Sequence, residues 1–428
     1  MVSNVRIAII GSGIAGNVAA YKLRQKYDIT VYEAAAYVGG HTNTVDVRDG
    51  DHTLAVDTGF IVFNDRTYPN FTKLLEEIGQ PWQDSEMSFS VHKAGGRLEY
   101  SGSSLNGLFA QRSNLLRPSF HRMVKDILRF NREAFTDISR SNRGLGLGEY
   151  LAENNYSSEF RNDYLVPMAA AIWSADTGAV LQMPAEFLVR FFKNHGLLQL
   201  DNRPQWRVIK GGSREYVRKL VHGHRDSIRL NSPVRSITRV ANGVEISTAE
   251  GGHEWYDHVF VACHSDQALA MLAEPTAVER EVLGAIRYQD NEAILHTDTA
   301  VLPSRKRAWA AWNYFVPQNH RSHVAVSYNM NILQGLNAEN TYVVTLNDDA
   351  RIAQDKILQR IQYQHPMLNC EAVAAQRRQA EINIDRVFYC GAYWHNGFHE
   401  DGVVSALNAI THFEERLEHE ELHLRRAG

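Results

Sequence analysis

The stretch from Arg6 to Glu33 constrains the fold of this chain more than any other. It reads RIAIIGSGIAGNVAAYKLRQKYDITVYE: an apolar run, a glycine-rich turn, a helical run and a second apolar run ending in an acid. The three glycines have the spacing G-x-G-x-x-G. Strand, glycine turn, helix and strand are the parts of a βαβ unit that binds a dinucleotide. The stretch therefore predicts an α/β fold with a dinucleotide-binding domain.

Each glycine of the motif has a physical task. Gly11 makes the tight turn, Gly13 lets a pyrophosphate approach the backbone, and Gly16 lets the helix pack close to the strand. The helix begins at Ile14 and Ala15, so its free N–H groups and its positive end point at the phosphates.

The acid at the end of the second strand indicates which nucleotide binds. Glu33 is placed to accept hydrogen bonds from both hydroxyls of an adenosine ribose, and we include the next residue, Ala34, in the predicted site. An acid at this position argues against a 2′-phosphate. FAD and NAD remain as the two candidates.

The residues after Glu33 favour FAD. The pattern E-x5-G-G-H-x-x-T, with Gly40, His41 and Thr42, resembles a signature of FAD-dependent oxidoreductases of the flavin-containing amine oxidase superfamily, which includes monoamine oxidases, protoporphyrinogen oxidases and carotenoid desaturases. That family usually has Arg where this chain has His41, and imidazole is a weaker donor to a phosphate. The following V-D-T-G-F resembles the D-x-G-x-x-x-F segment of the family and adds Thr58 and Gly59 to the implied FAD contacts.

A second segment near the end of the chain carries the same resemblance. The residues V-F-Y-C-G-A-Y-W, then G-F-H-E-D-G-V-V-S-A, resemble the C-terminal FAD signature of the superfamily. The resemblance implies that the turn at Gly391 and Ala392 approaches the pyrophosphate and ribityl chain. It also implies that a helix starting near Gly402 directs N–H groups at the flavin N1–C2=O edge, where reduction places negative charge. The residues assigned to this helix start are Asp401, Gly402, Val403 and Val404.

The middle of the chain adds weaker contacts. The resemblance implies a backbone contact of Val234 with the adenine side of FAD. Ala262 ends a buried strand, and ligands of parallel sheets bind at such carboxyl ends. Cys390 precedes the turn, which is not where a flavin-linked cysteine is expected, so we predict noncovalent FAD.

The motifs divide the chain into two interleaved domains. We predict a Rossmann-like FAD-binding domain made of residues 1–80, 205–267 and 376–428. Residues 81–204 and 268–375 form an α+β substrate domain. The first substrate segment reads as helical over 113–203. The second reads as a mixed sheet, with strands near 293–297, 308–315, 323–328 and 341–346 and a helix over 355–364.

Composition excludes several other classes of protein. The chain has 428 residues, 44% apolar and 22% charged, with a net charge of −4, which gives no reason to expect a nucleic acid partner. Three cysteines are too few for a disulfide framework and indicate a reducing compartment. The nucleotide strand begins so early that no signal peptide precedes it, and no apolar run reaches the length of a membrane span. We therefore expect a cytoplasmic protein, with membrane association as an alternative.

Two stretches invite further binding functions. Residues 117–140 place apolar residues at helical spacing between many basic ones. We favour an amphipathic helix with a solvated face, with peripheral membrane contact as the alternative. His395, His399, Glu400 and Asp401 could suggest a metal, but the segment is flanked by glycine and reads as a loop, so we predict no metal site.

The sequence also resembles a bacterial branch of predicted NAD/FAD-binding proteins. The resemblance rests on A-A-I-W-S, A-C-H-S-D-Q-A-L and G-A-Y-W-x-x-G-F-H-E-D-G. Members of that branch tend to be encoded beside methyltransferases that resemble cyclopropane-fatty-acid synthase. The resemblance implies a fatty-acyl or phospholipid substrate that gives a hydride to flavin N5.

The nearest polar candidates for catalysis are Tyr393, His395 and His399, on a loop expected to face the flavin. No convincing counterpart exists of the lysine that amine oxidases of this superfamily place near N5, which favours dehydrogenation of a carbon–carbon bond. An amine oxidase, a porphyrinogen-type oxidase and a redox-neutral fatty-acid isomerase remain alternatives. The chain has a single dinucleotide motif, so we expect oxygen, a quinone or an electron carrier to reoxidise the flavin.

Overall fold

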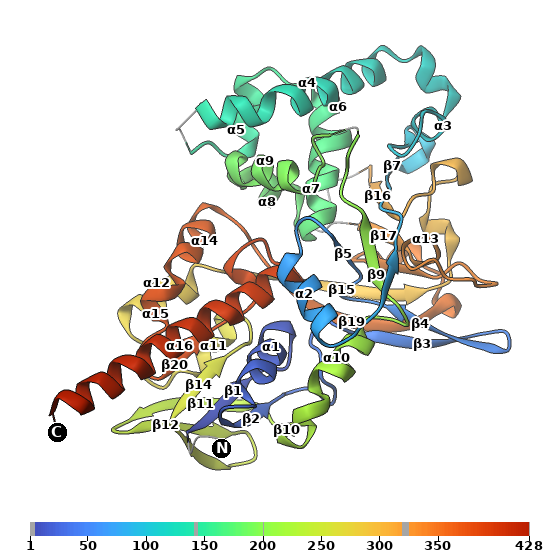
Figure 1. Ribbon diagram of the computed structural model, residues 1–428. Helices are drawn as coiled ribbons and strands as arrows, with labels where there is room; N and C mark the ends of the chain where they lie inside the picture. Colours follow the sequence, from blue (N-terminus) through green and yellow to red (C-terminus); the bar gives the residue numbers. More distant parts are fainter. Residues whose placement is uncertain (1–4, 141–143, 200, 319–324, 428) are drawn as a thin grey trace.

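The computed structural model describes residues 5–140, 144–199, 201–318 and 325–427. Two large sheets lie in different parts of the molecule (Figure 1). The first is a five-stranded parallel sheet in the order β10-β2-β1-β14-β20. Its strands are β1 (Arg6–Ile10), β2 (Asp28–Tyr32), β10 (Ile228–Arg229), β14 (His258–Val261) and β20 (Val387–Tyr389). This is the α/β sheet that the first motif predicts.

Both faces of the parallel sheet are covered, which is why its strands are apolar throughout. On one face, Ile7 and Ile9 pack in a core with α1 (Ile14–Leu23), α10 (Arg214–Val221) and α16 (His399–Ala427). On the other face, Ala8 and Ile10 pack in a second core. That core includes the antiparallel sheet of β11 (Val234–Val240), β12 (Gly243–Thr248) and β13 (His253–Tyr256), with α11 (Ser265–Met271) and α12 (Ala277–Gly284).

The second large sheet has seven strands in the order β19-β15-β18-β17-β16-β7-β8. All its neighbouring strands are antiparallel except β16 and β7, which are parallel. The strands are β7 (Phe89–Lys93), β8 (Glu99–Ser101), β15 (Tyr288–His296), β16 (Trp312–Val316), β17 (Ala325–Asn329), β18 (Val343–Leu346) and β19 (Ile357–Pro366). The predicted strand at 323–328 begins outside the described residues. Along the chain, groups of strands from one sheet alternate with groups from the other, which is compatible with interleaved domains. The domain boundaries stay a prediction.

A helical region covers one side of this second sheet and lies far from the parallel sheet (Figure 1). Its longest member, α4 (Pro118–Arg140), buries Phe120, Met123, Phe130 and Ala134 at helical spacing, as predicted for an amphipathic helix. The other helices are α3 (Leu105–Leu108), α5 (Leu147–Glu153), α6 (Ser158–Phe160), α7 (Val166–Trp173), α8 (Thr177–Gln182) and α9 (Ala185–Asn194).

Two predicted element assignments are wrong. Residues 357–366 form strand β19 instead of the predicted helix over 355–364, because they pair with β15 along nearly its whole length. The last helix begins at His399, earlier than predicted, so Glu400 and Asp401 lie in its first turn and not in a loop. No cluster of metal-binding side chains is found among the described residues.

Short elements connect the two large sheets. These are the hairpin β3 (Thr44–Asp49) and β4 (His52–Asp57), the sheet of β5 (Val62–Asn64), β9 (Trp206–Ile209) and β6 (Trp82–Asp84), and the helices α2 (Pro69–Glu77) and α13 (Met330–Leu333). The helices α14 (Cys370–Ala375) and α15 (Gln379–Ile382) lead back to β20.

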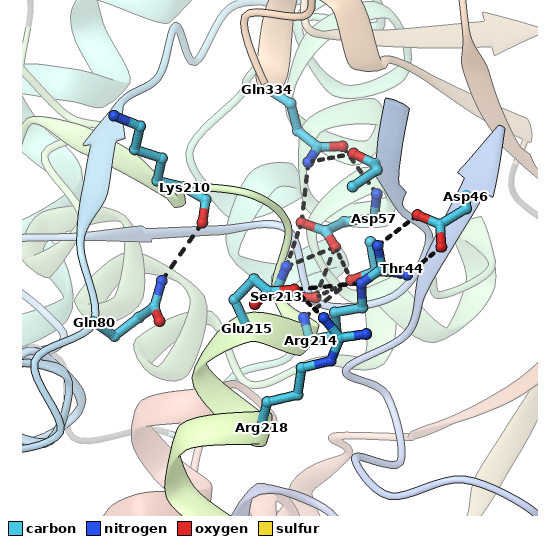
Figure 2. Close-up of polar contacts among 11 residues, drawn as sticks. Thr44, Asp46, Asp57, Gln80, Lys210, Ser213, Arg214, Glu215, Arg218 and Gln334 are labelled. Atoms are coloured by element: carbon cyan, nitrogen blue, oxygen red, sulfur yellow. Dashed lines mark hydrogen bonds and ion pairs between the residues drawn. The ribbon is translucent and has the colours of Figure 1, made fainter. Parts of the chain in front are cut away.

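The carboxylate of Asp57 is the centre of a buried polar network that joins these connecting parts (Figure 2). It accepts hydrogen bonds from Thr44 Oγ1 at 2.6 Å, from Ser213 N at 2.8 Å and Oγ at 2.7 Å, and from Gln334 Nε2 at 3.1 Å. Burial raises the pKa of Asp57 to about 6, against the effect of the hydroxyl and N–H donors. The three partners come from segments far apart in the chain, so one buried group fixes their relative positions.

The loop before α10 is shaped to reach this carboxylate. Gly212 has a φ of +94°, and a Cβ there would lie 2.7 Å from Thr44 Cγ2. At the edge of the network, Arg214 pairs with Asp46 at the surface, and Gln80 Nε2 donates to the carbonyl of Lys210 (Figure 2).

Replacing Asp57 by Ala should lower the free energy of unfolding by about 3 kcal/mol, because it leaves buried donors of Ser213 and Gln334 unpaired. Urea denaturation followed by circular dichroism measures this change. The matched control is Asp46→Ala, which removes a half-exposed carboxylate from the same network and should cost less than about 1 kcal/mol. Equal losses for the two variants would contradict the central role of Asp57.

Candidate cofactor and active site

The glycine turn after β1 forms an open cradle at the carboxyl end of the parallel sheet. Gly11 has a φ of +98°, and a Cβ there would lie 2.8 Å from the carbonyl of Ala262. A Cβ on Gly16 would lie 1.9 Å from the carbonyl of Gly11. A Cβ on Gly13, by contrast, would meet none of the described atoms within 4 Å. The fold therefore requires glycine at 11 and 16, whereas Gly13 borders free space at the start of α1.

Glu33 lies beside the cradle and is already held in place. Its Oε2 accepts from Ser12 N at 2.9 Å and from Ser12 Oγ at 2.5 Å, and its Oε1 accepts from Ala35 N at 2.8 Å. Ser232 N donates to the Glu33 carbonyl at 2.8 Å, which brings the segment before Val234 to the same edge. Ala34 is exposed beside it. The structure thus gathers these predicted adenosine contacts around one half-buried carboxylate.

The Gly-Gly-His loop packs against the glycine turn. A Cβ on Gly40 would lie 3.1 Å from Gly13 Cα, and a Cβ on Gly59 would lie 2.1 Å from the carbonyl of His41. Thr58 N donates to the carbonyl of Asn43 at 2.9 Å. These close backbone contacts explain why both segments are rich in glycine, and they bring two predicted FAD-binding segments together at the cradle.

Three imidazole rings meet at this loop. The ring of His41 lies 6.0 Å from that of His264 and 5.4 Å from that of His365, and it stacks on Tyr363 at 4.9 Å. Nε2 of His41 and Nδ1 of His264 are buried and have no hydrogen-bond partner within the described part of the chain. His365 Nδ1 lies 2.9 Å from the amide nitrogen of Asn291. Such unpaired ring nitrogens are available to a ligand.

Burial keeps these rings neutral. It lowers the pKa of both His41 and His264 to about 4 and that of His365 to about 3, and in each case a neighbouring histidine lowers the pKa further. The cluster therefore offers neutral hydrogen-bond donors. The superfamily pattern has instead the permanent positive charge of an Arg at the position of His41.

The C-terminal segment separates the three predicted catalytic residues. Tyr393 is buried against Gly391, and its hydroxyl has no hydrogen-bond partner among the described residues. His395 is exposed, and its carbonyl accepts from Gln376 Nε2. Ala392 lies between the buried turn and this loop, half-buried. Of the three, His395 is thus the one that is open to solvent.

His399 is enclosed at the start of α16. Its ring stacks on Phe60 at 3.5 Å, and its Nε2 lies 2.9 Å from Tyr216 Oη and 3.0 Å from Thr42 Oγ1. Burial holds the pKa of His399 well below its ordinary value. The His399 ring thus connects α16 with α10 and with the loop at Thr42. Such contacts are expected of a residue that positions neighbouring elements.

The helix start itself lies directly on the glycine turn. A Cβ on Gly402 would lie 2.5 Å from Ile14 Cγ2, and the side chain of Val403 belongs to the core that contains Ala15. The carboxylate of Asp401 accepts from Phe398 N at 2.9 Å and from Asn396 N at 3.2 Å, and burial raises the pKa of Asp401 to about 7. Val404 follows, half-buried. The N-termini of α1 and α16 therefore lie side by side.

A cavity of about 520 Å³ lies beside this helix start. Phe398 lines it and stacks with Phe191 of α9 at 5.5 Å, and Trp173 Nε1 of α7 donates to the Asn396 carbonyl at 3.1 Å. The other lining residues are Arg66, Thr67, Tyr68, Lys193, Asn194, His195, Gln199, Asn396, Glu400 and Asp401. The cavity thus lies between the helical region and the last FAD motif.

Sequence reasoning missed several residues of this site, among them Tyr363, His365 and Asn291. They lie on β19 and β15, and β19 was predicted as a helix. The alternation of Ile361, Tyr363 and His365 with Arg360, Gln362 and Gln364 is a strand signal that could have found them.

Comparison with known proteins agrees with this geometry. Residues 14–321 match the family described as flavin containing amine oxidoreductases. The chain belongs to this family. It is an enzyme family whose cofactor is FAD, and the chain is an FAD-dependent oxidoreductase.

Similar sequences include different kinds of flavin enzyme. A zeta-carotene desaturase from Synechocystis sp. is 30% identical over 115 residues, 25% of this chain and 23% of that protein. A protein assigned as a flavin-containing monoamine oxidase from Mycobacterium tuberculosis is 26% identical over 260 residues, 58% of this chain and 55% of that protein. The chain thus spans only part of each of these relatives.

Two solved structures show the fold along the whole chain. A protein assigned as a protoporphyrinogen oxidase from Exiguobacterium sp. has a TM-score of 0.68 and 18% identity, covering 98% of this chain and 100% of that one. A CLA-producing fatty acid isomerase from P. acnes has a TM-score of 0.66 and 17% identity, covering 96% and 100%. The cradle at Gly13 and the unpaired nitrogens of His41 and His264 fit a ligand with a pyrophosphate.

The two glycines allow folding to be separated from FAD binding. We expect Gly13→Ala to fold with the stability of the unchanged protein but to bind FAD at least about tenfold more weakly, because the added methyl takes the space of the pyrophosphate. Gly16→Ala should lower the melting temperature instead, because its methyl would overlap the Gly11 carbonyl. Thermal unfolding without FAD and titration of FAD fluorescence measure the two effects. A Gly13→Ala protein with unchanged FAD affinity would contradict the predicted position of the phosphates.

The imidazole cluster predicts that FAD binding takes up protons. The free site holds His41 neutral with a pKa of about 4, and a bound pyrophosphate would raise that pKa. Since the complex then binds more protons than the free protein, FAD affinity should rise as the pH falls, by up to about tenfold per pH unit per proton. FAD titrations from about pH 8 to about pH 5 measure this slope.

The control for this slope is His41→Arg, which restores the residue usual in the superfamily. Its charge does not titrate in this range, so its FAD affinity should depend less on pH than that of the unchanged protein. Equal slopes for the two proteins would show that His41 does not take up the proton.

Proposed function

We propose that this enzyme removes hydrogen from an apolar chain that carries an anionic group, a fatty-acyl or phospholipid substrate. The observation that carries this proposal is the charge of the cavity at Phe398. Arg66 and Lys193 line it, and neither has an ion-pair partner among the described residues. An anionic carboxylate or phosphate would be attracted there, and a cationic amine would be repelled.

The two acids of the cavity already accept hydrogen bonds from N–H groups of the chain itself. Glu400 already accepts hydrogen bonds from Asn70 N, Asn70 Nδ2 and Phe71 N at the start of α2, at 2.7 to 3.0 Å. Asp401 accepts from two N–H groups of its own turn. Both carboxylates therefore hold the fold around the cavity.

The aromatic surroundings suit an apolar chain. Tyr68, His195 and Phe398 line the cavity, and Phe191 stacks on both Phe398 and His195. Such rings offer a large apolar area to a ligand. The names of three relatives, a carotene desaturase, a protoporphyrinogen oxidase and a fatty acid isomerase, indicate apolar substrates for those proteins and support the proposal.

We assign the cofactor contacts as follows. Glu33, with Ala34 and Val234 near it, binds the adenosine; Gly13 and the start of α1 bind the pyrophosphate; Gly402 to Val404 direct N–H groups at the flavin. When bound, FAD supplies the acceptor of the substrate hydride. The chain positions the substrate in the cavity and keeps water from it. Tyr393, His395 and His399 stay predicted catalytic candidates, and the enclosure of His399 favours a positioning role.

The direct test is an anaerobic absorption spectrum of the FAD-loaded protein with free fatty acids and extracted phospholipids. We expect the flavin bands to bleach. NADH should not bleach them rapidly, because the chain has one dinucleotide motif. Bleaching by amines alone would overturn the proposal in favour of an amine oxidase.

The two cations give a sharper test with matched substrates. The double variant Arg66→Gln, Lys193→Gln should raise KM for a free fatty acid by about tenfold or more while leaving KM for its uncharged methyl ester nearly unchanged. Equal effects on both substrates would show that these cations do not bind the anionic group.

A redox-neutral isomerase is the second candidate, and one observation favours it. The fatty acid isomerase from P. acnes shares the fold over 96% of this chain. Conversion of an unsaturated fatty acid to a product of equal mass, without consumption of oxygen or another acceptor, would select this alternative.

A further inference from the structure

A small projection of the substrate region exposes three leucines. It consists of α3, the 3₁₀ helix η2 (Arg112–Leu116) and the 3₁₀ helix η6 (Lys306–Ala308), and we call it the leucine tip. Leu105, Leu115 and Leu116 have exposed fractions of 77%, 50% and 88%. Apolar side chains this exposed and this close in sequence are unusual on a surface that meets only water.

The same projection carries a group of cations without matching acids. A groove of about 740 Å³ on the tip is lined by Arg112, Arg305, Lys306 and Arg307, with Ala110, Gln111 and Ser113. The sequence contains no Asp or Glu from residue 102 to 125 or from residue 299 to 338. Glu99 of β8 is buried and accepts hydrogen bonds from the Arg305 side chain and from the N–H groups of Ser304 and Arg305. Arg112, Lys306 and Arg307 have no ion-pair partner in the described ranges.

The neighbouring helix α4 differs from the tip in this respect. Its arginines Arg122, Arg129 and Arg132 pair with Glu159, Asp126 and Glu133. Three basic side chains of this helix thus have acidic partners, whereas Arg112, Lys306 and Arg307 at the tip have none in the described ranges. In Figure 1 the tip's helix α3 stands at the far end of the molecule from the parallel sheet.

We propose that the leucine tip docks on the surface of an anionic phospholipid bilayer. The leucines enter the boundary between headgroups and acyl chains, and the cations contact lipid phosphates. A nucleic acid would match the cations but would leave Leu105, Leu115 and Leu116 in water. The contact is peripheral, since no helix in the described ranges is apolar enough over sufficient length to cross a membrane.

The test is co-sedimentation of the FAD-loaded protein with vesicles of phosphatidylglycerol and phosphatidylethanolamine, compared with vesicles of phosphatidylcholine. We expect binding to the anionic vesicles to be at least about tenfold stronger and to weaken with salt. Equal binding to both, or binding to neither, would overturn the proposal.

Two sets of variants locate the contact. Leu115→Ser with Leu116→Ser, and separately Arg112→Gln with Lys306→Gln and Arg307→Gln, should each lower binding to anionic vesicles by about tenfold. The matched controls change exposed residues elsewhere: Leu230→Ser with Leu358→Ser, and Lys210→Gln with Arg218→Gln and Arg225→Gln. The controls should bind as the unchanged protein does.

The outcomes separate this proposal from the proposed function. Reduction of the flavin by a detergent-dispersed fatty acid should be the same in the tip variants and the unchanged protein, since the tip lies outside the cavity. If the controls weaken vesicle binding as much as the tip variants, docking at the tip is wrong whatever the substrate is. If the protein binds a DNA or RNA duplex more tightly than anionic vesicles, the cations serve a nucleic acid instead.

Discussion

A single buried carboxylate, that of Asp57, fixes the relative positions of several segments that connect the two large sheets. Asp57 ends the hairpin that follows the Gly-Gly-His loop, and its donors come from the loop before α10 and from the end of α13. A charge without water is costly unless several donors compensate it, so the network is stable only when all these segments are in place. Thr44 follows the Gly-Gly-His loop at the glycine turn, and Gln334 lies between β17 and β18 of the seven-stranded sheet. The position of that sheet relative to the glycine turn therefore depends on this contact.

The candidate cofactor site differs from the superfamily pattern at position 41, where the pattern has a permanently charged Arg and this chain has a His. A guanidinium in place of His41 would be a permanent cation, whereas His41, His264 and His365 are neutral in the free protein because burial and mutual proximity lower each pKa. A permanent cation next to two buried imidazoles would depress their protonation still further. A histidine at position 41 therefore leaves the charge of the whole cluster to be set by the ligand that enters it.

The sequence predicted the parts of the site that depend on local geometry. Gly11 and Gly59 in loops, and Gly402 near the start of α16, each need glycine because a Cβ would collide with nearby backbone or side-chain atoms. Such requirements produce a glycine spacing that can be recognised in the sequence. It did not predict β19, because that strand is stabilised by pairing with β15, some 70 residues earlier in the chain. This pairing brings Tyr363 and His365 to the site. The enclosure of His399 likewise depends on Phe60 and Tyr216, which no local pattern connects to it.

The cations at the cavity and at the leucine tip that are unpaired within the described ranges suggest how the proposed membrane contact and the proposed substrate site are related. Lys193 at the cavity and the cations of the leucine tip belong to the predicted substrate domain, whereas Arg66 lies in the predicted FAD-binding segment 1–80. The tip joins strands of the seven-stranded sheet directly, since η6 precedes β16 and α3 follows β8. An enzyme docked by the tip would therefore hold the substrate region next to the bilayer and the parallel FAD sheet away from it (Figure 1). In this orientation an anionic lipid would reach the substrate region before the cofactor, and an acceptor from the aqueous side could approach the FAD sheet independently.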